Sequence, residues 1–157
     1  MALSNYERII QLSDEVFSSR TDPDQLNVDE KVMERLELIH PDTLSEYDDG
    51  NGPVCWILCI PTTIDLMSKF IDQKISEREL YELTPLNTKY EAIYMCSALL
   101  LEEFRGKGIA QNLAVQALEN IKTDHNIKAL FFWAFSKEGE KLAEKLSGLM
   151  GLPLYRR

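Results

Sequence analysis

One stretch, Tyr94–Ile121, constrains the fold of this chain more than any other. It begins with an apolar run, Tyr94–Leu101, which is dense enough to predict a buried strand. A short charged segment with two glycines, Glu102–Gly108, follows the run. Apolar residues then recur at helical spacing over Ile109–Ile121. The sequence therefore predicts a strand, a glycine-rich turn and a helix in immediate succession.

The turn between this strand and this helix has the features of a phosphate-binding loop. Gly106 and Gly108 let the backbone approach a ligand closely. The first amides of the helix have no partners within it, and the helix dipole adds partial positive charge there. Arg105 and Lys107 add cationic side chains. An ordinary turn with solvated basic residues explains the same residues equally well, so the chemistry alone leaves both interpretations open.

The turn does not match two common nucleotide-binding loops. The Walker pattern GxxxxGK[ST] is excluded because Ile109 follows Gly108, and the dinucleotide pattern GxGxxG is excluded because Gln111 stands where the third glycine belongs. The segment Arg105–Ala110 instead fits the loop (Q/R)xxGx(G/A), with the expected strand before it and helix after it. On these residues the chain resembles the GNAT superfamily of acyl-CoA-dependent N-acyltransferases. The resemblance covers about residues 93–121 and extends toward 148.

The resemblance implies an α/β fold with a mixed, mostly antiparallel sheet flanked by helices, in one domain of residues 1–157. Two parallel strands, 90–101 and 127–135, would splay at their C-terminal ends and admit the pantetheine arm of acetyl-CoA. The first strand would pair with that arm through its main chain, and the loop amides would hold the pyrophosphate. Ser136 would contact the pantetheine, although it also suits a helix N-cap. The implied cofactor-binding residues are Ala98, Leu99, Leu100, Arg105, Gly106, Lys107, Gly108, Ile109, Ala110 and Ser136.

Helical and strand patterns alternate over the rest of the chain. A flavodoxin-like order is disfavoured because a hairpin precedes the key strand and only one crossover follows it. The sequence of residues 48–52 is typical of a hairpin turn. A calcium-binding loop is disfavoured because the segment lacks the ligand spacing of such a loop. We expect helices at about 4–19, 27–39, 63–71, 76–84 and 137–146, strands at 43–47, 53–60 and 152–157, a turn at 20–25, and a helix end at Gly148 and Gly151.

The helical segment 62–84 departs from the family pattern. In the GNAT fold the two strands that flank this segment usually join by a tight turn. An insertion at this point would cover or reshape the acceptor side of the site.

The catalytic residues are less well indicated than the cofactor loop. The family often places a glutamate base on the strand before the loop, and Tyr94 stands at that position, with Glu91 on the opposite face. Tyr94 is therefore the candidate catalytic residue, and a core aromatic is the alternative interpretation. The tyrosine that often protonates the leaving thiolate is absent from the last helix, where Leu142 and Ala143 stand. Tyr155 or a water molecule would have to replace it.

Composition limits the kinds of partner. The net charge is −9, from 26 acidic and 17 basic residues, which disfavours general nucleic-acid binding. Such a charge favours cationic amines or peptides as partners, and a role in solubility alone explains it equally well. Cys55 and Cys59 would lie roughly 13 Å apart along one strand, too far for a disulfide. We expect all three cysteines to be buried thiols, and no metal, since His40 and His125 show no ligand spacing.

These inferences favour an N-acetyltransferase that uses acetyl-CoA and a primary amine of a small molecule or peptide, with direct attack in a ternary complex. A non-catalytic acyl-CoA-binding or regulatory relative is one alternative, and an unrelated α/β interaction domain is another. The N-terminus lacks the charged and apolar regions of a signal peptide, so a cytoplasmic protein without membrane attachment is expected. The sequence leaves a homodimer open.

Overall fold

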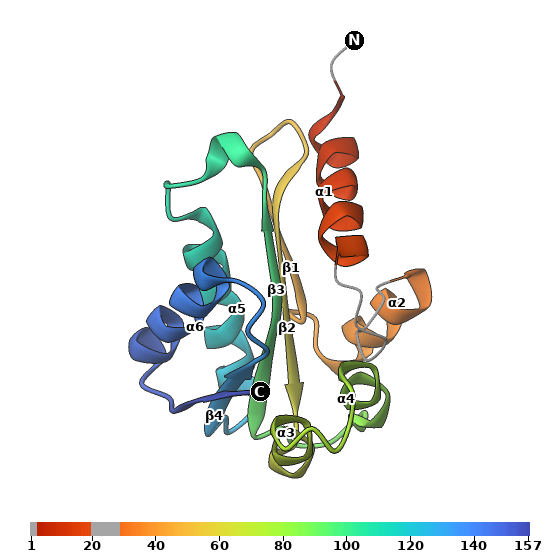
Figure 1. Ribbon diagram of the computed structural model, residues 1–157, viewed down its shortest axis with the longest axis vertical. Helices are drawn as coiled ribbons and strands as arrows, with labels where there is room; N and C mark the ends of the chain where they lie inside the picture. Colours follow the sequence, from red (N-terminus) through yellow and green to blue (C-terminus); the bar gives the residue numbers. More distant parts are fainter. Residues whose placement is uncertain (1–2, 20–28) are drawn as a thin grey trace.

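The structure, a computed structural model, describes residues 3–19 and 29–157, except for the side chains of residues 16–19. A five-stranded mixed sheet of order β1-β2-β3-β4-β5 runs through the molecule, with helices on both faces (Figure 1). β1, β2 and β3 pair antiparallel, whereas β3, β4 and β5 pair parallel. The predicted fold class, an α/β mixed sheet flanked by helices, is confirmed. The predicted turn 20–25 lies outside the described residues.

The strands follow the apolar runs of the sequence. The predicted hairpin between the first two strands is confirmed by their antiparallel pairing. In its turn, the Asp48 carboxylate accepts hydrogen bonds from the amides of Gly50 and Gly52, at 2.7 and 3.1 Å. The fourth strand is shorter than the predicted segment 127–135. The strands are β1 (Leu44–Asp48), β2 (Pro53–Thr62), β3 (Ala92–Leu100), β4 (Ala129–Phe132) and β5 (Leu154–Arg156).

Several helices begin at a residue whose side chain caps the helix. Asp29, Thr63, Ser76 and Ser136 each accept a hydrogen bond from a backbone amide of the helix that follows. The helices are α1 (Asn5–Ser19), α2 (Glu30–Ile39), α3 (Ile64–Ile71), α4 (Glu77–Leu83), α5 (Ile109–Asp124) and α6 (Lys137–Met150), with a short 3₁₀ turn, η1 (Glu102–Phe104), before α5.

The expected end of the last helix is wrong at Gly148 and right at Gly151. α6 continues through Gly148 and ends at Gly151, whose φ of +66° is left-handed. An exposed glycine inside a helix costs only about 1 kcal/mol, which packing of the helix offsets. Leu149 is 56% exposed, although it lies near helical spacing from Leu142 and Leu146, and Met150 is buried instead.

The helices form two layers, one on each face of the sheet. α1 and α2 lie on one face, α5 and α6 lie on the other, and α3 and α4 lie beyond one end of the strands (Figure 1). β2 and the first half of β3 are buried almost throughout, so the core runs through the middle of the sheet.

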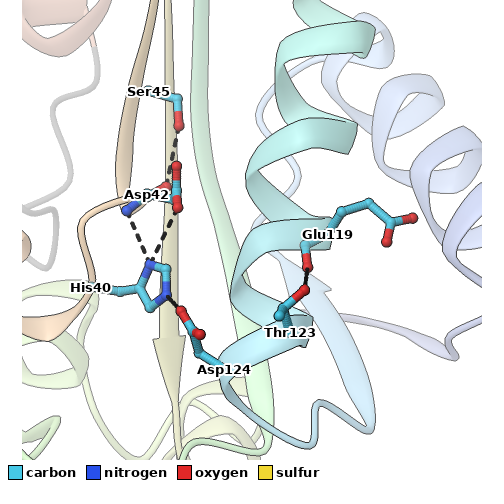
Figure 2. A network of polar contacts seen from close by, with 6 residues as sticks. All are labelled: His40, Asp42, Ser45, Glu119, Thr123 and Asp124. Atoms are coloured by element: carbon cyan, nitrogen blue, oxygen red, sulfur yellow. Dashed lines mark hydrogen bonds and ion pairs between the residues drawn. The ribbon is translucent and has the colours of Figure 1, made fainter.

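A buried histidine joins the two layers (Figure 2). His40, which follows α2, is 4% exposed, and its Nδ1 accepts a hydrogen bond from the Asp42 amide at 3.0 Å. Its Nε2 therefore carries the proton and donates to Asp124 Oδ2, at 2.7 Å, at the end of α5. This contact fastens the end of α2 to the end of α5.

Candidate functional site

β3 and β4 separate at their C-terminal ends. They pair only where Ala92–Met95 faces Ala129–Phe132. β4 then ends, whereas β3 continues to Leu100. The register of β3 against β2 shifts at Cys96, which is an extra residue on β3, and a bulge of this kind bends a strand. The second half of β3 consequently has no neighbouring strand on the β4 side.

The backbone groups on this edge follow from the pairing with β2. The Leu101 amide donates to the Val54 carbonyl on β2, at 2.9 Å. Because successive residues of a strand point their backbone groups to opposite sides, those of Leu100 and Ala98 point away from β2 into the gap. Leu99 points its groups toward β2. The backbone groups of this edge that face the gap are therefore those of Ala98 and Leu100, whereas those of Leu99, which was also expected to pair with the cofactor, face β2.

A cavity of about 360 Å³ occupies the gap between the separated strands. Its walls come from the second half of β3, from the segment after β4, and from α5 and α6. Five of the residues predicted to bind the cofactor line it, namely Ala98, Leu100, Arg105, Ala110 and Ser136. The Ser136 hydroxyl also accepts from the Gly139 amide at 3.0 Å, so this side chain caps α6 and faces the cavity.

The loop before α5 adopts the conformation that its glycines allow. Gly106 and Gly108 have φ of +78° and +76°, in the left-handed region that other residues rarely adopt. Gly108 is the N-cap of α5 and has no side chain that could accept a hydrogen bond from the first helix amides. Gly106, Lys107 and Gly108 are exposed, and Ile109 is half-buried. This segment lies between Arg105 and Ala110 in sequence, and both of those residues line the cavity.

An ion pair joins the start of this loop to α1. The Arg8 guanidinium donates to both carboxylate oxygens of Glu103, at 2.6 Å for Nη2 and Oε2. This hydrogen bonding holds the pKa of Glu103 at about 2. Residues 95 positions apart in the chain thus fix η1 against the first helix.

The candidate catalytic residue Tyr94 is fully buried, and a glutamate from the inserted helices accepts a hydrogen bond from it. The Tyr94 hydroxyl donates to Glu77 Oε2 at 2.5 Å, and Cys96 Sγ lies 3.8 Å from the same oxygen. Glu77, the first residue of α4, is 1% exposed. Cys96 also lines the cavity, so this carboxylate lies directly behind the cavity wall.

Sequence reasoning missed Glu77. A signal was present, because Glu77 precedes the buried residues Leu80 and Tyr81 by three and four positions and so shares their face of α4. It was missed because a glutamate on the first turn of a capped helix is usually exposed and stabilises the helix through its dipole.

Other side chains considered for proton transfer lie elsewhere. Glu91 forms an ion pair with Lys128 at 3.2 Å. Tyr155 lies on β5 and is 45% exposed. Leu142 and Ala143 of α6 do line the cavity, but they offer no proton to a leaving group there.

All three cysteines are buried, and none forms a disulfide. Burial raises the pKa of Cys55 to about 11 and that of Cys59 to about 12. Among residues 3–19 and 29–157, no group of three or more His, Cys, Asp or Glu side chains is arranged to hold a metal ion. Within the same described part of the chain, no helix is both long and apolar enough to cross a membrane.

The chain was compared with protein-family models, curated proteins and solved structures. No protein-family model matches the chain, and a search of curated proteins found no match. Among solved structures, the chain is similar to an aminoglycoside acetyltransferase from an uncultured soil metagenomic sample in complex with sisomicin, with 12% identity, a TM-score of 0.50, and coverage of 92% of this chain and 83% of that one. The trehalose complex gives 11% identity and the same TM-score, with coverage of 92% and 82%. This chain therefore has a GNAT-like fold.

Proposed function

We propose that this protein is an N-acyltransferase that transfers an acetyl group from acetyl-CoA to a primary amine of a small molecule or peptide. The observation that carries the proposal is the free edge of β3, where the backbone groups of Ala98 and Leu100 face a cavity of about 360 Å³. The loop Arg105–Ala110 at the end of this edge and the similarity of the fold to an acetyltransferase support it.

Acetyl-CoA would lie along this edge with its phosphates at the loop. The backbone groups of Ala98 and Leu100 would pair with the pantetheine arm as a neighbouring strand does. The amides at the start of α5 would bind the pyrophosphate, with Arg105 and Lys107 beside it. Ser136 would contact the arm from the opposite wall.

When bound, acetyl-CoA supplies an activated acyl group, and the protein supplies orientation and proton transfer. Glu77 would accept the proton that the acceptor ammonium loses, with its carboxylate held in place by Tyr94. The amine nitrogen would then bond to the acyl carbon as the carbon–sulfur bond breaks, and a water molecule would pass the second proton of this nitrogen to the departing thiolate. The Leu100 amide would stabilise the charge that develops on the carbonyl oxygen.

A non-catalytic acyl-CoA-binding protein is the second candidate. It is favoured by the burial of both Tyr94 and Glu77, at 0% and 1% exposure, and by the apolar side chains of Leu142 and Ala143 on α6. Under this alternative the cavity binds the cofactor and no amine is modified.

The first experiment measures binding of acetyl-CoA by thermal unfolding. At a concentration 100 times the Kd, the melting temperature should rise by about 5–10 °C. Gly108→Trp should abolish the rise, because the indole would fill the space before the first amides of α5. Gly50→Trp is the matched control, since Gly50 also has a positive φ, of +105°, at the hairpin tip. The absence of a shift with the wild-type protein would refute both candidates.

The second experiment separates the two candidates. Release of free thiol from acetyl-CoA is followed with a panel of primary amines. Amine-dependent release supports the transferase, whereas a thermal shift without thiol release supports the binding protein.

A further inference from the structure

The guanidinium of Arg157 lies in a cage made of two aromatic rings and a carbonyl group. Its Cζ is 4.5 Å from the ring centroid of Phe70 and 4.5 Å from that of Trp133. The two rings are nearly perpendicular, at 83°. Nη1 donates a hydrogen bond to the Ile75 carbonyl at 2.9 Å. Aromatic faces and a carbonyl oxygen are the groups that bind an organic cation.

The cage is next to the site described above. Trp133 also lines the 360 Å³ cavity, so one ring borders both spaces. The Phe70 ring also packs against Tyr94, with ring centroids 4.9 Å apart, and Tyr94 in turn bonds to Glu77. A cation in the cage is therefore one side chain away from the cavity and one side chain away from the Tyr94–Glu77 pair.

The backbone holds Arg157 in this position. Its amide donates to the Phe132 carbonyl at 3.0 Å, which continues the pairing of β5 with β4. The preceding residue, Arg156, points elsewhere and forms an ion pair with Glu140 at 3.0 Å. The two adjacent arginines thus have different environments, and only Arg157 lies between aromatic rings.

The distribution of charge along the chain suits a cationic ligand. Positions 1–91 carry 19 acidic and 8 basic residues, whereas positions 92–157 carry 7 acidic and 9 basic residues. The acidic half supplies Phe70, Ile75 and Glu77. The other half supplies the loop and helix proposed to bind the anionic cofactor. The net charge of −9 over the whole chain favours the approach of cations.

We propose that Phe70, Trp133 and the Ile75 carbonyl form a subsite for a second cationic group of the acceptor, apart from the amine that reacts, and that the Arg157 side chain occupies this subsite until the acceptor displaces it. The proposal rests on the transferase function proposed above, and it names the acceptor class as an amine that carries a second alkylammonium group. An alkylguanidinium ion, which keeps its proton, binds the same subsite as an inhibitor.

The test measures binding of ethylguanidinium through the fluorescence of Trp133. The chain has two tryptophans, so each protein carries Trp56→Phe. In Arg157→Ala, ethylguanidinium should change the fluorescence saturably, with an affinity about tenfold higher than in the parent if Arg157 fills the subsite about 90% of the time. The neutral analogue ethylurea should not. Arg156→Ala is the matched control and should behave as the parent.

Two outcomes would overturn the proposal: no saturable response in Arg157→Ala, or an equal response to ethylurea. If Arg157→Ala unfolds below the assay temperature, Arg157→Gln replaces it, since glutamine keeps a donor for the Ile75 carbonyl. If ethylguanidinium inhibits thiol release by the wild-type protein in competition with the amine, this result supports the subsite independently. Binding of acetyl-CoA does not depend on this subsite. If the subsite proposal fails, the thermal shift with acetyl-CoA should still be observed, so this failure is distinguishable from failure of the transferase proposal.

Discussion

The hydroxyl of Tyr94 donates a hydrogen bond of 2.5 Å to the carboxylate of Glu77, 17 positions earlier in the chain. Both side chains are buried, and they belong to β3 and α4. A carboxylate in the interior is stable only with such partners. The contact therefore fixes α4 against the sheet, close to the point where β3 and β4 separate.

Replacement of Tyr94 by phenylalanine should destabilise the protein. The change removes a hydrogen bond to a buried carboxylate and leaves the ring packing intact, so the free energy of unfolding should fall by about 1–3 kcal/mol. Urea denaturation of Tyr94→Phe beside the wild type measures the difference. Tyr47→Phe is the control, because Tyr47 is 44% exposed on β1. Equal stability of Tyr94→Phe and the wild type would show that the hydroxyl contributes nothing to the fold.

Replacement of Glu77 by glutamine should separate binding from transfer. Glutamine keeps an acceptor for the Tyr94 hydroxyl but cannot take a proton from the amine. Thiol release should therefore fall by about 100-fold or more, while the thermal shift with acetyl-CoA is retained. Glu79→Gln on the same helix should have wild-type activity. Wild-type transfer by Glu77→Gln would exclude this carboxylate as the proton acceptor.

The cysteines should differ in reactivity toward iodoacetamide at pH 8. Burial raises the pKa of Cys55 and Cys59 to about 11 and about 12, so their reactive thiolates are scarce. Cys96 is 8% exposed and lines the cavity, so it should be modified first. Acetyl-CoA should slow its modification several-fold. Peptide mass spectrometry identifies the site, and modification of Cys96 at the same rate with and without acetyl-CoA would place the cofactor outside this cavity.

Stability should fall as the pH drops below about 6.5, in part through His125. Burial, together with the nearby charges of His40 and Lys89, lowers the pKa of His125. The unfolded chain then binds a proton more readily than the folded protein just below the ordinary histidine pKa of about 6.5, so acid favours unfolding. Melting temperatures at pH 7.5 and 5.5 should differ less for His125→Gln than for the wild type. An equal difference in both proteins would contradict the prediction.

Most elements were predictable because their signals are local. The caps at Asp29, Thr63, Ser76 and Ser136 act on the helix that follows each one. The strand, glycine turn and helix from β3 to α5 follow from adjacent residues. Gly148 misled the prediction, since a glycine in a helix is tolerated where packing on either side continues the helix.

The geometry of the gap was not predictable from residue patterns. The run after Ile127 is apolar as far as Phe135, yet β4 ends at Phe132. The bulge at Cys96 and the end of β4 together decide which backbone groups of β3 face the cavity. These depend on register with neighbouring strands, which a single strand's sequence does not specify.

The sequence by itself determined the loop from Arg105 to Ala110, the strand before it and the helix after it, because each depends on residues a few positions apart. The tertiary structure alone decided that Glu77 meets Tyr94, and that Arg157 lies between Phe70 and Trp133. Residues so distant in the chain meet only when the core around them is packed, and their partners are therefore set by the whole fold rather than by any local pattern.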